Sequence, residues 1–88
     1  MKAFTKREVI NITTKNIIAS LNATKAQATN PKTSLQYDLD ATSFGVLDLL
    51  INLWEDLELD FKDIPAVQVH TVGDFQRLAL NATRAKTR

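Results

Sequence analysis

SFGVLDLLINLWEDL, residues 43–57, contains the most apolar part of this 88-residue chain. On a helical wheel, at about 100° per residue, its polar positions gather in one narrow wedge. That wedge comprises Gly45, Asp48, Asn52, Glu55 and Asp56, and the remaining arc comprises Phe44, Val46, Leu47, Leu49, Leu50, Ile51, Leu53, Trp54 and Leu57. An apolar arc of this width exceeds what one neighbour covers. The pattern therefore predicts a helix that lies centrally, with packing partners on two sides.

Two further helices are predicted on either side of this one. Apolar residues repeat at near-helical spacing from about Thr5 to Leu21, at Val9, Ile10, Ile17, Ile18 and Leu21. Thr71-Val72-Gly73-Asp74 has the spacing of a capping box, with Thr71 as N-cap and Asp74 reaching back. It predicts a last helix over about Val72–Ala82, whose apolar face comprises Val72, Phe75, Leu78, Ala79 and Ala82.

The segments between these helices are less regular. Asn22 to Asp40 contains Asn30-Pro31 and many short polar residues, which predicts a long loop anchored by Leu35 and by Leu39. Phe61 to Gln68 favours a short irregular helix or turn that packs Phe61, Val67 and Val69. The expectation is an all-α, small four-helix bundle with a long loop between helices one and two and a short third helix. It forms one domain over residues 1–88, with a core of about 5–82 and a basic tail at 83–88.

Composition excludes most catalytic chemistry. The chain is 44% apolar and 24% charged, which is typical of a globular protein. It has no cysteine and a single histidine, His70, so it offers no disulfide, thiolate or histidine cluster. No catalytic residue and no metal site is therefore expected, and the chain is not predicted to be an enzyme. The N-terminus lacks the pattern of a signal peptide and no stretch could span a membrane, so a cytoplasmic protein is expected.

The net charge of +1 hides a strong segregation. Residues 1–32 carry a net charge of +5, residues 33–76 carry −8, and residues 77–88 carry +4. The acidic middle predicts a local field that attracts basic surfaces. The basic ends lack a recognition motif and stacking aromatics, so nucleic acid is not an expected partner and solvated faces are the simpler interpretation.

One loop-to-helix junction has chemical interest. Asp38-Leu39-Asp40-Ala41-Thr42-Ser43-Phe44 brings a serine to the start of the acidic, apolar-backed helix. This segment resembles the Asp-Leu-Gly-x-Asp-Ser-Leu junction of the acyl carrier protein family. The resemblance continues without a gap from about Leu35 to Leu80, with Asp48-Leu49 on the family's Glu-Leu and Val69 to Val72 on its Ile-Thr-Thr-Val step. The first predicted helix, with its Ile17-Ile18 pair, and the long loop also resemble the family in length and pattern, so the resemblance covers nearly the whole chain.

The resemblance implies a function and a cofactor. In that family a separate transferase moves phosphopantetheine from coenzyme A onto the serine hydroxyl, and its thiol then carries acyl groups between enzymes. It implies that Ser43 is the attachment site of covalent 4'-phosphopantetheine. A phosphodiester there would face unpaired backbone N–H groups and the positive end of the helix macrodipole. The expected partners are a phosphopantetheinyl transferase and acyl-transferring or acyl-modifying enzymes. They would dock a monomer through Asp40, Thr42, Phe44, Asp48, Glu55 and Asp56.

The chain departs from the family pattern at a few positions. Thr42 stands where the family usually has Asp, Asp40 replaces a Gly, and Gly45 replaces a polar residue. Both ends are basic, whereas the family is acidic throughout. These departures favour a free-standing carrier for a specialised lipid, polyketide or related pathway over the general carrier of fatty acid synthesis.

Three other interpretations stay open on the sequence alone. Ser43 has an ordinary structural role available, as the N-cap of its helix, although Thr42 could cap as well. The chain could be an unmodified carrier-like module that docks a basic partner through the acidic helix. It could also be a basic-tailed domain that binds anionic membranes or nucleic acid.

Overall fold

The computed structural model describes residues 4–60, 62 and 69–86, with side chains as far as Thr83. The described residues form four α-helices: α1 (Lys6–Leu21), α2 (Lys25–Thr29), α3 (Ser43–Asp56) and α4 (Val72–Lys86). They contain no strand, only an isolated antiparallel bridge between Ser34 and Thr71. The all-α fold class is confirmed, and α3 begins at the predicted residue and ends one residue before the predicted end.

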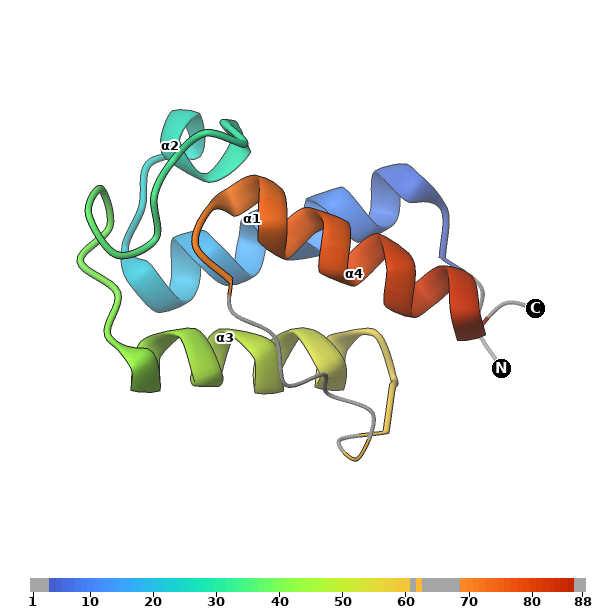
Figure 1. The fold of residues 1–88 in the computed structure, drawn as a ribbon. Coiled ribbons are helices and arrows are strands. Elements are labelled where there is room, and N and C mark those ends of the chain that lie inside the picture. Colours follow the sequence, from blue (N-terminus) through green and yellow to red (C-terminus); the bar gives the residue numbers. More distant parts are fainter. Residues whose placement is uncertain (1–3, 61, 63–68, 87–88) are drawn as a thin grey trace.

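The helix at the centre of the described bundle is α1. It packs against α2, α3 and α4, and α4 crosses it obliquely (Figure 1). The central place that the sequence pattern assigned to α3 was therefore wrong for this part of the chain. Two interior positions of α1, Thr13 and Asn16, are polar and buried. Thr13 donates to the Ile10 carbonyl oxygen at 2.7 Å, so its hydroxyl is satisfied within the helix. The spacing of apolar residues alone therefore underestimates the buried face of α1, because it leaves out Thr13 and Asn16.

Local capping sets where α1 begins. Thr5 is the N-cap, and its hydroxyl accepts a hydrogen bond from the Glu8 backbone N–H at 3.1 Å. The Glu8 carboxylate in turn accepts from the Thr5 backbone N–H at 3.0 Å, which completes a capping box. The helix ends at Leu21 because Asn22 adopts the left-handed conformation, with φ of 54°.

The segment from Asn22 to Asp40 is not wholly a loop. It contains α2, whose N-cap Thr24 and third residue Gln27 form a second capping box. A helix of five residues bears too few apolar positions to show a period, so the sequence pattern missed it. The anchors Leu35 and Leu39 are buried as expected. The short helix or turn expected at Phe61–Gln68 lies outside the described residues, except for Lys62.

The last helix is longer than expected. It begins at Val72 as predicted and continues to Lys86, four residues beyond the predicted Ala82. Val72, Phe75 and Ala79 are fully buried, and Leu78 and Ala82 are half-buried. Thr83 continues this buried face. Its hydroxyl can be buried because it donates a hydrogen bond to the Ala79 carbonyl oxygen at 3.0 Å. In the described part of the chain, no helix has both the length and the apolarity to cross a membrane.

Candidate functional site

Ser43 is the first residue of α3 and is exposed. The start of α3 lies at one end of the bundle (Figure 1). The capping role belongs to its neighbour, because the Thr42 hydroxyl accepts a hydrogen bond from the Gly45 backbone N–H at 3.1 Å. Among the described residues, none forms a hydrogen bond with the Ser43 hydroxyl. Of the two residues that the sequence left as candidate caps, the structure selects Thr42. The hydroxyl of Ser43 is thus accessible and is not used to hold the helix.

The start of α3 has room for an anionic group. Gly45 donates to Thr42 Oγ1, and the Val46 backbone N–H donates to the Thr42 carbonyl oxygen at 3.0 Å. Within the described chain, the backbone N–H groups of Ser43 and Phe44 have no such acceptor. Free N–H groups in the first turn favour a phosphate, and the macrodipole adds to this preference. The residues present therefore fit a phosphodiester on Ser43.

The backbone of Asp40 explains one departure from the family pattern. Its φ is 54°, in the left-handed region that glycine occupies without cost. The position where the resemblance expects Gly is therefore a position that requires this conformation. Aspartate is among the few other residues that enter it readily, so the turn leading to α3 is kept despite the substitution.

The loop before α3 is fixed to the start of α4. The Leu35 backbone N–H donates to the His70 carbonyl oxygen at 2.9 Å, and the Val72 N–H donates to the Thr33 carbonyl oxygen at 3.0 Å. Gly73 completes the contact by donating to the Pro31 carbonyl oxygen at 2.9 Å. Within the loop, the Asp38 carboxylate accepts from the Ser34 N–H at 2.7 Å. These hydrogen bonds hold the approach to Ser43 against the core.

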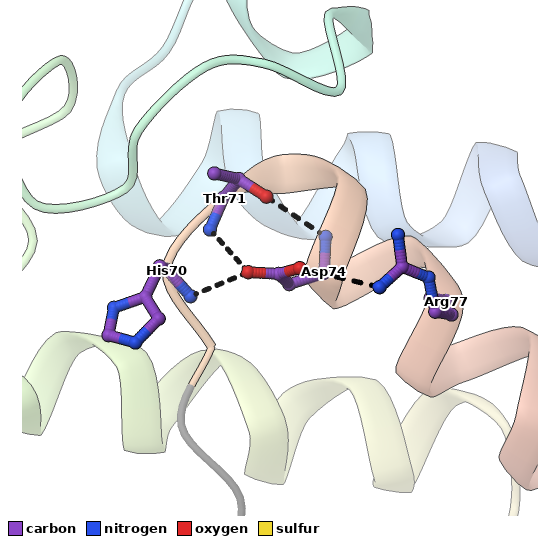
Figure 2. A network of polar contacts seen from close by, with 4 residues as sticks. All are labelled: His70, Thr71, Asp74 and Arg77. Carbon is purple, nitrogen blue, oxygen red and sulfur yellow. Dashed lines mark hydrogen bonds and ion pairs between the residues drawn. The ribbon is translucent and has the colours of Figure 1, made fainter.

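Asp74 organises the α4 side of this contact (Figure 2). Its Oδ2 accepts from the backbone N–H groups of His70 at 3.2 Å and Thr71 at 3.3 Å, and its own N–H donates to the Thr71 hydroxyl at 3.1 Å. The predicted capping box is confirmed. Arg77 lies 3.7 Å from Oδ1, but its side chain is largely exposed, so this ion pair contributes little. The imidazole of His70 projects away from the network, and only the backbone of His70 takes part.

The pKa of Asp74 is lowered from its ordinary value. Partial burial alone would raise the pKa, because it disfavours the charged carboxylate. The backbone N–H groups of His70 and Thr71, the Thr71 hydroxyl and the charge of Arg77 favour the ionised form and together exceed that cost. Asp74 therefore stabilises the fold when it is charged.

Asp74→Asn should be less stable than the unsubstituted chain at pH 7, by about 1 kcal/mol for a hydrogen-bonded group. Because the folded pKa lies below the unfolded one, the contribution is complete above the unfolded value of about 3.9 and is lost as pH falls through the folded value. Urea unfolding at a series of pH values should show the gap between the two proteins closing in acid. Asp48→Asn, at an exposed position, is the control and should show no gap. A gap that stays constant down to the most acidic pH would contradict a role for the charge.

The exposed face of α3 differs from its polar wedge. Phe44 is 80% exposed and Leu47 is 47% exposed, although both belong to the apolar arc of the wheel. At the opposite edge, an ideal Cβ on Gly45 would lie 3.8 Å from Leu21 Cδ2, and Asp56 Oδ2 accepts a hydrogen bond from Asn16 Nδ2 at 3.0 Å. The position of α1 thus covers part of the polar wedge and leaves two apolar side chains outside.

The structure distributes the predicted docking residues around Ser43 and along α3. All six are exposed: Asp40, Thr42, Phe44, Asp48, Glu55 and Asp56. Asp40 and Thr42 precede Ser43, while Phe44 and Asp48 lie within the first two turns of α3. Asp56 lies at the far end of the helix and already accepts the bond from Asn16. Leu47 was not among the predicted docking residues, because its apolar character placed it in the core.

No group of side chains in the described part of the chain could hold a metal ion. The site consists of the exposed Ser43 hydroxyl, the backbone N–H groups of Ser43 and Phe44 in the first turn of α3, and a face of α3 that mixes carboxylates with two exposed apolar side chains. This arrangement defines a small helical bundle with an exposed serine at the start of one helix and a mixed acidic and apolar face along that helix.

Comparison with known proteins agrees with this description. The chain is 32% identical over 73 residues to the acyl carrier protein of Picosynechococcus sp. (strain ATCC 27264 / PCC 7002 / PR-6), which covers 83% of this chain and 85% of that protein. A search of family models found no match. The chain belongs to the acyl carrier protein family, as a distant member. Its general role is therefore that of an acyl carrier rather than an enzyme.

Proposed function

We propose that this protein carries acyl groups as thioesters on a phosphopantetheine arm attached to Ser43, as a monomeric cytoplasmic carrier for a specialised pathway. The observation that supports the attachment most directly is the division of roles at the start of α3. Thr42 caps the helix, so Ser43 keeps an exposed hydroxyl without a partner among the described residues. In the transfer, the Ser43 oxygen bonds to phosphorus and the pyrophosphate bond of coenzyme A breaks. The adenosine bisphosphate leaves, and the hydroxyl proton passes to a base of the transferase.

Partner enzymes are proposed to dock on the exposed face of α3. Asp48 and Glu55 supply negative charge along this face, and Phe44 and Leu47 supply apolar area next to Ser43. Charged groups at the rim of an interface guide encounter, and apolar side chains at its centre provide affinity. The fitting partner is a basic surface with a small apolar pocket close to its active-site entrance. Because the charges are exposed, this docking should weaken as salt is added.

The attachment is tested by incubating the protein with coenzyme A and a phosphopantetheinyl transferase and weighing the intact chain. We expect a gain of one phosphopantetheine in the unsubstituted protein and none in Ser43→Ala. Since Thr42 provides the cap, Ser43→Ala should change the free energy of unfolding by less than about 0.5 kcal/mol. Ser20→Ala removes an exposed serine from α1 and is the matched control, which should gain the full mass.

Two outcomes would contradict the attachment. A mass gain that survives Ser43→Ala would place the modification elsewhere. No gain with several transferases, including one from the source organism, would favour an unmodified module that docks through α3. Thr42→Asp refines the result, because Asp caps a helix as well as Thr does and restores the carboxylate of the family pattern. If a general transferase modifies only Thr42→Asp, the native chain depends on a dedicated transferase.

A further inference from the structure

The exposed apolar and aromatic side chains of the described chain gather around Ser43. The large ones are Ile18, Tyr37, Phe44 and Leu47. One exposed side chain of this kind on a surface needs no explanation. Here, however, three of the four fall within residues 37–47, on both sides of Ser43 in the sequence. The most exposed of them, at 83%, is Tyr37, which lies in the loop before α3.

Tyr37 lies on a turn whose backbone is fixed. Its N–H donates to the Ser34 hydroxyl at 3.0 Å, and the N–H of the next residue, Asp38, donates to the Ser34 carbonyl oxygen at 3.0 Å. The residues that flank the turn, Leu35 and Leu39, are both buried in the core. A partner would therefore have to order only the tyrosine side chain. Tyrosine supplies a large contact area at low entropic cost, because it has only two side-chain torsions.

This turn lies within reach of a protein that covers Ser43. The chain from Tyr37 to Ser43 would span about 20 Å if it were fully extended. The Ala41 N–H donates to the Leu35 carbonyl oxygen at 2.8 Å, so the segment folds back and the distance is shorter. Figure 1 shows the loop before α3 and the start of α3 at the same end of the bundle. An interface of ordinary size covers about 800 Å² on each partner, which is roughly 30 Å across, so one footprint includes both residues.

The charge on this surface favours a basic partner. Residues 33–60 contain no Lys, Arg or His, so positive charge lies only beyond the two ends of this stretch, at Lys32 and Lys62. Asp40 and Asp48 lie on either side of Ser43 and are exposed, and neither forms an ion pair with the described residues. A protein that covers Ser43 therefore meets unpaired carboxylates around apolar side chains. Its complement is a basic rim around an apolar pocket.

We propose that Tyr37 is a specificity-determining contact of the enzyme that modifies Ser43, with its ring held in an apolar pocket of that enzyme. This inference rests on the proposed attachment at Ser43. A serine hydroxyl is only one carbon from the backbone, so an enzyme that forms a bond to it must seat its active site on the start of α3. Enzymes that act later, at the thiol of the arm, need not approach so closely. A transferase without a pocket for Tyr37 would meet a bulky side chain on a fixed turn, which discriminates against it.

The test is the rate at which a phosphopantetheinyl transferase from the source organism adds mass to the full chain, measured over a range of chain concentrations. Tyr37→Ala should lower kcat/KM on the order of 10-fold, the effect of losing a buried aromatic contact. The change should lie in KM, because the contact is made equally before and during the reaction. Tyr37→Phe keeps the ring and should stay within about twofold of the unsubstituted chain. Gln36→Ala removes an exposed side chain from the same turn and is the matched control, which should show no change.

The outcomes separate this inference from the attachment itself. Equal kcat/KM in Tyr37→Ala and the unsubstituted chain would overturn the role of Tyr37 and leave the attachment at Ser43 intact. So would an equal fall in Gln36→Ala, or a fall in Tyr37→Ala accompanied by a lower urea midpoint, because either would assign the effect to the turn and not to the ring. No mass gain in the unsubstituted chain would remove the attachment, and the role of Tyr37 with it.

Discussion

Leu35→Ala should destabilise the protein by about 2–5 kcal/mol, the range for removing a buried leucine side chain. Leu35 lies in the loop before α3, yet only 1% of its surface is exposed, and its N–H is bonded to the His70 carbonyl oxygen. A chain of 88 residues has a total stability near the lower part of the usual range of about 5–15 kcal/mol. The substitution should therefore leave a measurable fraction of the molecules unfolded at 25 °C.

Tyr37→Ala is the matched control for Leu35→Ala. It removes a larger side chain from the same loop, but one that is 83% exposed, so its effect should stay within about 0.5 kcal/mol. Trp54 is the only tryptophan and is 1% exposed, so its fluorescence reports unfolding in urea for both variants. Equal stability of the two variants would mean that the loop does not belong to the core.

The helices were predictable where an apolar period is long enough to be recognised. Such a period gave α1, α3 and the beginning of α4, and the capping-box spacing located Thr71 and Asp74. The five-residue α2 is too short for apolar positions to repeat recognisably, and its capping box is visible only as Thr24 followed three residues later by Gln27. That pair is a signal which could have located α2 from the sequence.

The arrangement of the helices was less predictable than their existence. Asn16 is a polar residue that the sequence offers no reason to bury, yet it packs inside and bonds to Asp56. This contact and the approach of Leu21 to Gly45 fix which side of α3 faces α1. A wheel of α3 alone contains no information about either partner. It therefore placed Phe44 and Leu47 among the covered positions, although both are exposed.

The position of Ser43 at the start of α3 was predictable, but the availability of its hydroxyl was not. Thr42 and Ser43 are both favoured caps by residue type, and serine is slightly the better of the two. The choice depends on which of the two residues has the extended backbone of an N-cap. Thr42 has it, with φ of −85° and ψ of 170°, whereas Ser43 is already the first residue of the helix. The left-handed Asp40 and the bonded loop before it set that conformation.

Gly73→Ala should destabilise the protein by about 1–3 kcal/mol, although alanine is the better helix former by up to about 1 kcal/mol. An ideal Cβ at this position would lie 2.9 Å from the Pro31 carbonyl oxygen and 3.1 Å from Pro31 Cβ. The obstacle is backbone, which yields less easily than the end of a side chain. Relief of the clash would separate α4 from the loop and would break the bond from the Gly73 N–H to Pro31. The measurement is the free energy of unfolding in urea.

Gly45→Ala is the matched control for Gly73→Ala, and it should have the opposite sign. The nearest atoms to an added Cβ are Thr42 Oγ1 at 3.5 Å and Leu21 Cδ2 at 3.8 Å, which are ordinary contacts. The gain in helix propensity then remains. It is up to about 1 kcal/mol at a central helix position and should be smaller at Gly45, because this residue lies in the first turn. If both variants gained stability, the loop would not be held against α4. Amide hydrogen exchange would distinguish the cases, because only a loosened loop should accelerate exchange at the Leu35 and Val72 N–H groups.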